Sequence, residues 1–297
     1  MDKRDSYLAF LKSKAVKAEK HGIDVTPEDV HPCLFPHQRD IVVWAATGGR
    51  RAIFASFGLG KTLIQLELMR LFHNANGGKG VIICPLGVKQ EFTRDAKNLL
   101  GMDVQYVRTS EEVKASTTPF LITNYERVRD GGIDPSLFSF ASLDEASVLR
   151  GYGTKTYQTF LEIFQVVPYR FVCTATPSPN RHKELIHYAG FLGIMDTGQA
   201  LTRFFQRDST KANNLTLYPH KEKEFWLWIS TWAVFITKPS DFGYSDKGYD
   251  LPDIRVIWHE LKVDHTEAGA DRWGQSKMFR DAAVSLKEAA REKRDSM

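Results

Sequence analysis

The sequence predicts an α/β fold in which a mostly parallel sheet is covered by helices on both faces. Short runs that are apolar throughout alternate with stretches of helical periodicity, and strands buried on both faces of a parallel sheet are continuously apolar in this way. We expect strands over 52–57, 80–85, 104–108, 119–124, 138–143 and 170–175. We expect helices over 61–74, 87–99, 154–166 and 181–193. Ligands of such sheets bind at the carboxyl ends of the strands, so that edge is where functional motifs are sought.

Both ends of the chain are expected to be helical in part. Apolar residues between Tyr7 and Leu11 predict an amphipathic helix within residues 1–30, before a turn at Thr26–Asp29. Residues 254–259 have the pattern of a strand, and 276–294 carry an apolar helical stripe. Before them, within 225–235, five residues recur at helical spacing and predict a helix that buries aromatic side chains, with base stacking on its tryptophans as the alternative. They are Phe225, Trp228, Ile229, Trp232 and Phe235.

The composition is that of a globular cytoplasmic protein. Hydrophobic residues make up 42% and charged residues 26% of the 297 residues, which is enough for a sizeable core. The net charge of +4 permits a polyanionic partner without requiring one. The three cysteines lack metal-ligand spacing and are expected to be core residues in a reducing compartment. The charged start of the chain predicts no signal peptide, and the lack of a long apolar stretch predicts no membrane partner.

A phosphate-binding loop is predicted between the apolar run 52–55 and the helix that follows it. Glycines let successive backbone N–H groups point inward, and the helix directs its positive N-terminus at the same place. Lys61 is expected to reach the β- and γ-phosphates, and the Thr62 hydroxyl to ligate Mg²⁺. A strict motif begins with glycine where this chain has Ala55. The loop consists of Ser56, Phe57, Gly58, Leu59, Gly60, Lys61 and Thr62.

A pair of carboxylates closes a second apolar run. Asp144 and Glu145 follow the run 138–143, and a buried strand that ends in Asp-Glu supplies what nucleotide hydrolysis needs. Asp144 is expected to hold Mg²⁺, and Glu145 to orient and polarise the attacking water. An isolated Asp-Glu pair is more often a solvated loop, but here it lies downstream of a Gly-Lys-Thr loop.

Two further motifs complete the pattern. Thr174, Ala175 and Thr176 end the apolar run that begins at Phe171, where their hydroxyls can bond both the Asp-Glu loop and the γ-phosphate region. Gln38 precedes the first strand, and its amide can read the edge of an adenine with two hydrogen bonds. Each of these would be unremarkable alone, but their order along the chain makes one set.

In this order the motifs resemble those of helicase superfamily 2, and most closely those of the Swi/Snf-type DNA translocases and their phage and prophage relatives. The similarity covers residues 34–195 with specific motifs and continues more loosely to about 265. The phosphate loop has the Gly-Leu-Gly-Lys-Thr spelling of the Swi/Snf branch. The matching segments are Phe35–Gln38, Phe57–Thr62, Ile83–Leu86, Ile122–Glu126, Asp144–Ser147 and Thr174–Pro177, followed by Asn180 and Glu184–Leu185.

The resemblance implies a RecA-like lobe over 31–199 that binds ATP and Mg²⁺, after an N-terminal helical segment over 1–30. It implies that 200–297 extend this lobe and lead to a second one. It also implies that Thr174 and Thr176 couple nucleotide state to DNA, with double-stranded DNA as the preferred track, and that the protein is bacterial or phage-encoded. The implied DNA contacts are Pro85, Leu86, Lys89, Thr123 and Asn124, through phosphate rather than bases.

The chain departs from the family pattern at two places. Ser147 stands where the family has His or Asp, a side chain that contacts the coupling motif. The family's second lobe also carries an arginine finger within Gln-x-x-Gly-Arg-x-x-Arg, and nothing after Thr176 spells that motif. A complete ATP site is therefore expected to need a second RecA-like lobe, in cis or in trans.

Three functions are compatible with these motifs. The first is the motor half of a DNA-dependent ATPase that couples ATP hydrolysis to movement on DNA. The second is a single-lobe module that binds ATP and DNA but hydrolyses nothing until a partner supplies the second lobe. The third is an unrelated P-loop kinase, which would have no need for Gln38 or for the Thr174–Thr176 motif.

Overall fold

The computed structural model describes residues 17–178, 181–207, 215–249 and 255–258. The chain divides into two compact units, Met1–Tyr249 and Asp250–Met297, and the fold below is that of the first. The helices predicted near Tyr7 and over 276–294, and the motif residue Asn180, lie outside the described residues. Of the strand predicted over 254–259, only 255–258 are described, and they have no regular secondary structure.

Seven parallel strands form the central sheet, in the order β3-β4-β2-β5-β6-β1-β9. The six strands predicted between residues 52 and 175 are all present, with ends shifted by up to two residues, which confirms the α/β prediction. The strands are β1 (Arg50–Ala55), β2 (Gly80–Ile83), β3 (Gln105–Tyr106), β4 (Phe120–Thr123), β5 (Phe140–Asp144), β6 (Tyr169–Thr174) and β9 (Ala233–Ile236).

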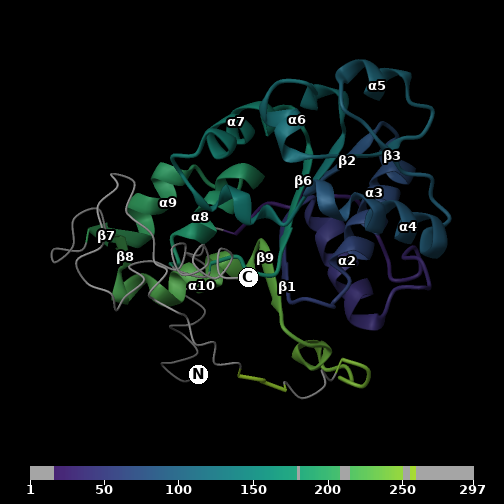
Figure 1. Ribbon diagram of the computed structural model, residues 1–297. Helices are drawn as coiled ribbons and strands as arrows, with labels where there is room; N and C mark the ends of the chain where they lie inside the picture. Colours follow the sequence, from purple (N-terminus) through teal and green to yellow (C-terminus); the bar gives the residue numbers. More distant parts are fainter. Residues whose placement is uncertain (1–16, 179–180, 208–214, 250–254, 259–297) are drawn as a thin grey trace, which may run out of the picture. The chain divides into compact units, whose positions relative to one another are not determined.

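Helices cover both faces of the sheet (Figure 1). On one face lie α2 (Pro36–Gly48), α3 (Lys61–Asn76) and α4 (Lys89–Leu100). On the other lie α5 (Ser110–Ala115), α6 (Tyr125–Arg129), α7 (Lys155–Ile163), α8 (Glu184–Leu192), α9 (Thr197–Phe204) and α10 (Glu222–Ser230). None of the helices in the described part of the chain has the length and apolar character needed to cross a membrane.

The side chains of each strand alternate between two separate hydrophobic cores. On β1, Ile53 and Ala55 pack with α2 and α3, whereas Ala52 and Phe54 pack with the helices of the opposite face. Successive side chains of a strand point to opposite faces, so a sheet covered twice needs apolar residues at every position. This is the physical reason for the continuous apolar runs seen in the sequence.

The predicted aromatic helix is shorter than its periodicity suggested. Helix α10 ends at Ser230, and the Thr231 hydroxyl donates to the Trp228 carbonyl oxygen at 2.7 Å as the chain turns. Trp232 is buried after the turn, and Phe235 lies on β9 with 43% of its surface exposed. The prediction was wrong for these two residues because pairing with β1, which begins with the bond from the Ala52 N–H to the Trp232 carbonyl oxygen, overrides the helical spacing.

A small hairpin and four helices, α2, α5, α6 and α9, were not predicted. Strands β7 (Phe205–Arg207) and β8 (Leu215–Leu217) pair antiparallel after α9. Helices α5, α6 and α9 have only five to eight residues, too few to show a clear period in the sequence. Among these elements, α2 contributes a residue to the predicted nucleotide site, Gln38.

Candidate functional site

The predicted phosphate loop joins β1 to α3 with the expected backbone. Gly58 and Gly60 have φ values of 81° and 75°, which curl the chain in a way that side-chain-bearing residues rarely adopt. Lys61 is the first residue of α3, and its Nζ donates to the carbonyl oxygens of Ala55 at 3.0 Å and Ser56 at 3.3 Å. The ammonium group therefore lies within the loop, beside the positive N-terminus of a 16-residue helix.

Gln38 holds the phosphate loop against the start of α2. Its Nε2 donates to the Leu59 carbonyl oxygen at 3.2 Å, and its Oε1 accepts the Phe35 N–H at 2.9 Å. A Cβ on Gly60 would lie 2.2 Å from Gln38 Nε2, so only glycine fits beside the amide. Gln38 is buried and bonded at both ends of its amide, and its contact with adenine stays a prediction.

Asp144 ends β5 with its carboxylate buried and 6% of the residue exposed. Its Oδ1 accepts a hydrogen bond from Gln65 Nε2 at 2.8 Å. Burial raises the pKa of Asp144 to about 6, partly offset by the Gln65 bond and by the charge of Lys61. The raised pKa shows that burial makes the ionised form of Asp144 unfavourable. A cation bound beside the carboxylate would offset this cost by neutralising its charge.

Glu145 has an unusual backbone conformation. Its φ and ψ are both 48°, and it is the sole residue other than glycine with positive φ in the described part of the chain. Such a conformation costs on the order of 1 kcal/mol and clusters at functional sites. Thr174 Oγ1 donates to Glu145 Oε2 at 3.2 Å and accepts the Thr176 N–H at the same distance. The Glu145 carboxylate therefore lies beside Thr174, the last residue of β6.

Ser147 and Thr62 sit beside these groups. Ser147 Oγ reaches the Glu145 carbonyl oxygen at 3.4 Å, a weak local contact. Thr62 is half-buried in the first turn of α3. No cluster of three or more His, Cys, Asp or Glu side chains that could hold a metal ion occurs among the described residues. A divalent cation here would have Thr62 and Asp144 as protein ligands and need other oxygens, as Mg²⁺ bound through phosphates does.

The predicted DNA contacts fall into two groups. Lys89 Nζ lies over the Tyr106 ring, 4.7 Å from its centre, and Leu86 is 58% exposed after Pro85. Thr123, in contrast, is fully buried, and its hydroxyl donates to the Val107 carbonyl oxygen at 2.8 Å. Asn124 is also buried, and its Oδ1 accepts the Tyr106 hydroxyl at 2.9 Å. The structure therefore places Lys89 and Leu86 on the surface and the two polar side chains inside it.

Sequence reasoning missed two residues that hold Asp144. Gln65, on α3, bonds the carboxylate, and the Tyr125 hydroxyl donates to the Asp144 backbone carbonyl at 2.6 Å. Gln65 is a polar residue between Ile64 and Leu66 in a buried part of a helix. A buried polar side chain needs a partner, so its place in an apolar stretch was the available signal.

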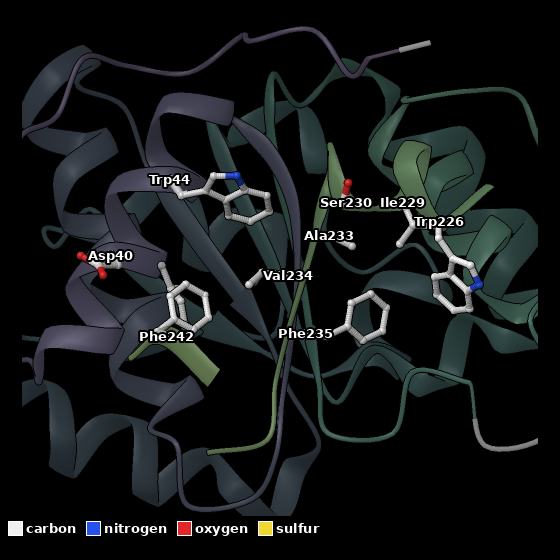
Figure 2. A pocket seen from close by; sticks show the side chains of 10 residues that line it. Asp40, Trp44, Trp226, Ile229, Ser230, Ala233, Val234, Phe235 and Phe242 are labelled. Atoms are coloured by element: carbon white, nitrogen blue, oxygen red, sulfur yellow. The ribbon is translucent and has the colours of Figure 1, made fainter. Parts of the chain in front are cut away.

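A separate apolar groove lies along β9, away from these motifs. It has a volume of about 450 Å³, and in Figure 2 Trp44 and Phe242 lie on one side of β9 while Trp226 lies on the other. Besides the indole N–H groups of Trp44 and Trp226, its lining has two polar side chains, Asp40 and Ser230, and Asp40 already accepts the Tyr244 hydroxyl at 2.7 Å. This lining lacks the convergent donors that a triphosphate needs, so it is not the nucleotide site.

Two solved structures with a similar fold are SWI2/SNF2 ATPase cores. The SWI2/SNF2 ATPase core of Sulfolobus solfataricus in complex with dsDNA matches 75% of this chain with a TM-score of 0.63 and 19% identity. A structure described as the SWI2/SNF2 ATPase core domain of the same organism matches 73% with a TM-score of 0.58 and 18% identity. The chain spans about half of their length, 48% and 46% respectively.

These matches confirm the predicted fold, a RecA-like α/β lobe built on a mostly parallel sheet. At this level of identity they show the fold alone. No family model and no curated protein matches the sequence. The chemistry of the site is therefore argued from the residues of this chain.

Proposed function

We propose that this chain is the ATP-binding first lobe of a DNA-dependent ATPase that couples ATP hydrolysis to movement on DNA. One observation carries the proposal. The phosphate loop, the Asp144-Glu145 turn and the Thr174–Thr176 motif follow β1, β5 and β6, which are consecutive neighbours in the sheet. Three motifs separated by up to about a hundred residues thereby meet at one carboxyl edge. The similarity of the fold to a SWI2/SNF2 ATPase core supports the same function.

The loop fits the phosphates of ATP. Gly58 and Gly60 allow the backbone to curl, and the N-terminus of α3 supplies inward N–H groups and a positive dipole. Phe57 and Leu59 complete the loop, and the Lys61 ammonium would exchange its bonds to loop carbonyls for bonds to the β- and γ-phosphates. Gln38 would hold the loop in place and take part in recognition of adenine.

The donor set at the loop also fits Mg²⁺. Thr62 and Asp144 would hold the ion, which when bound neutralises charge on the phosphates. Glu145 would orient the attacking water and accept its proton, with its carboxylate held by the Thr174 hydroxyl. Lys61 would stabilise the negative charge of the transferred phosphoryl group.

Coupling to DNA is proposed to run through Thr174, Ala175 and Thr176. These residues join the Glu145 carboxylate to the end of β6. The DNA surface would include Pro85, Leu86 and Lys89, with Thr123 and Asn124 supporting it from inside. Contacts to phosphate carry no base information, as movement along DNA requires. The dsDNA in the similar Sulfolobus solfataricus complex favours a double-stranded track.

A second RecA-like lobe is part of the proposal. Residues up to Tyr249 belong to the same compact unit as the lobe, including β9 beside β1, and the remainder of 200–297 is proposed to lead towards the second lobe. An arginine finger contributes roughly 10³-fold or more in other phosphoryl-transfer enzymes. The second candidate function is an ATP- and DNA-binding module that hydrolyses nothing until a partner supplies the second lobe.

ATP hydrolysis with and without duplex DNA tests the proposal, with a Swi/Snf-type second lobe added in trans. We expect slow turnover by the chain alone and DNA-stimulated turnover in the mixture. Glu145→Gln should lower turnover by about 10²- to 10⁴-fold while ATP still binds, and Lys61→Ala should weaken ATP binding itself. Binding of ATP and DNA by the chain alone with no turnover, and turnover only after the second lobe is added, would favour the binding module. DNA-stimulated turnover that Lys61→Ala leaves unchanged would refute both functions.

A further inference from the structure

A buried chain of hydrogen bonds connects β5 to α3 behind the Asp144 carboxylate. Ser142 Oγ donates to Gln65 Oε1 at 2.7 Å, and Gln65 Nε2 donates to Asp144 Oδ1 at 2.8 Å. Ser142 and Gln65 are fully buried, and Asp144 nearly so. In a buried, low-dielectric setting these bonds are stronger and more directional than in water.

The geometry of the strand and the helix explains why one amide reaches both groups. Ser142 and Asp144 are two residues apart on β5, so their side chains lie on the same face, about 7 Å apart along the strand. That face packs against α3. On α3, Gln65 follows Lys61 by four residues, and residues at this spacing share one face of a helix. A single helix face thereby supplies the ammonium of the phosphate loop and the amide behind the carboxylate.

The amide of Gln65 can adopt one orientation only. An ionised carboxylate accepts hydrogen bonds and donates none, so it requires the NH₂ end of the amide. The Ser142 hydroxyl donates to the opposite end and holds it there. If the amide rotated by half a turn, its oxygen would face the carboxylate oxygen of Asp144 and the bond would be lost. Ser142 thus fixes Gln65, and Gln65 fixes one oxygen of Asp144.

We propose that Gln65 is a positioning residue for the metal site: it holds Asp144 Oδ1 so that the rest of the carboxylate is presented to the phosphate loop. Gln65 is then required for the Mg²⁺-dependent part of nucleotide binding and not for binding of the nucleotide itself. The inference rests on the proposed function, because it assumes that Asp144 and Thr62 hold Mg²⁺ with a bound nucleotide.

Titration of the full chain with a fluorescent ATP analogue, at graded free Mg²⁺ and in excess chelator, tests this role. Gln65→Met keeps the length of the side chain and removes both hydrogen bonds. We expect the Mg²⁺ concentration for half-maximal enhancement of binding to rise about 10- to 100-fold, the usual effect of losing a residue that orients a metal ligand. Affinity in chelator should stay within about twofold of wild type, since the phosphate loop is intact.

Two further variants calibrate the result. Ser142→Ala leaves Gln65 in place and removes the bond that orients it, so a smaller shift in Mg²⁺ dependence is expected. Leu66→Val alters the neighbouring buried residue of the same helix and makes no polar contact with Asp144. It should lower the urea midpoint of unfolding and leave the Mg²⁺ dependence unchanged.

The outcomes separate this inference from the proposed function. A folded Gln65→Met protein with the Mg²⁺ dependence of wild type would overturn the inference alone. If Gln65→Met does not fold, Gln65→Asn, one methylene too short to bridge both groups, decides in the same way. Wild-type protein that binds no nucleotide with or without Mg²⁺ would overturn the proposed function and this inference together.

Discussion

A charged side chain is buried at each end of the strands of the central sheet, at the carboxyl edge and at the amino edge, but the hydrogen bonding of the two charges differs. At the carboxyl edge, Asp144 is 6% exposed and bonded to Gln65 through its side chain. At the amino edge, Arg170 is the second residue of β6, is 4% exposed and lies directly opposite Arg50 in the register of β1. Arg170 Nε has no hydrogen-bond partner among the described residues. Burial raises the pKa of Asp144 to about 6, whereas burial and the charge of Arg50 lower the pKa of Arg170 to about 10.

The charged groups at the two edges also differ in the kind of hydrogen-bond partner they have. At the amino edge the arginines reach main-chain carbonyls, as in the bond from Arg50 Nε to the Pro168 carbonyl oxygen at 2.9 Å. At the carboxyl edge, side chains bond to side chains, and Thr174 and Gln65 hold the carboxylates of Glu145 and Asp144. Orientation of charged groups by other side chains is what a binding site requires. The side-chain bonds at the carboxyl edge are those that the proposed metal site needs, whereas the Arg50 bond at the amino edge goes to the backbone.

The largest expected effect comes from removing the charge at the carboxyl edge. Asp144→Asn should abolish Mg²⁺-dependent turnover, because the site loses its anionic metal ligand. The same change should raise the free energy of unfolding of the ligand-free protein at pH 7 by up to about 3 kcal/mol, since the pKa of Asp144 rises from 3.8 to about 6 on folding. Equilibrium urea unfolding and ATP turnover measure the two effects.

The sign of the pH dependence gives a second readout. A carboxyl group with a raised pKa binds its proton more tightly in the folded state, so its contribution to stability falls as pH rises from about 4 to about 6. Above pH 6 the full cost is present, and Asp144→Asn should remove this part of the pH profile. If Asp144→Asn destabilises the protein at pH 7, the carboxylate is stabilising and the contrast between the two edges fails.

Alanine substitutions at Gly58 and Gly60 test how closely the phosphate loop packs against Gln38 at the carboxyl edge. Both have positive φ, so alanine at either position should cost about 1–2 kcal/mol of stability. Gly60→Ala adds a clash with Gln38 Nε2 at 2.2 Å, whereas a Cβ on Gly58 meets nothing within 4 Å. We expect Gly60→Ala to be the more destabilising by about 1–3 kcal/mol, as measured by chemical unfolding. Equal losses at the two positions would show that Gln38 yields easily.

At the amino edge, Arg170→Met should be neutral or stabilising by about 1–3 kcal/mol, because it replaces a buried guanidinium that has no acidic partner in the described part of the chain. Arg203→Met is the matched control. Because Arg203 pairs with Glu224 at 2.5 Å, this substitution should lower the stability of the protein. Thermal unfolding at pH 7 distinguishes them. A loss at Arg170 as large as at Arg203 would mean that its contacts at the C-terminal end of α8, where its Nη2 lies beside Gly193, are worth more than the burial costs.

The sequence was sufficient for features that depend on local pattern and insufficient for those that depend on which strands are neighbours. Continuous apolar runs located six of the seven strands, and the motifs at their ends located Lys61, Asp144 and Thr174. Strand β9 was missed because Trp232 and Phe235 also fit a helical period. The role of Gln65 depends on α3 packing over β5, which no local pattern specifies. The burial of Thr123 likewise depends on Val107 lying beside it.

The smallest expected effect separates the surface and buried parts of the proposed DNA contact. Lys89→Ala should weaken binding of a labelled duplex modestly and equally for different sequences, and should lower the slope of log K against log salt by about 1, because one phosphate contact is lost. Thr123→Val removes the bond to the Val107 carbonyl oxygen and should cost about 1 kcal/mol of stability. Its effect on duplex affinity should be negligible, because the hydroxyl is inside the protein. Fluorescence anisotropy at several salt concentrations measures both. The buried Thr123 hydroxyl could contact phosphate only if β4 shifted. A large loss of duplex affinity in Thr123→Val, with an unchanged salt slope, would therefore show that DNA binding rearranges this end of the sheet.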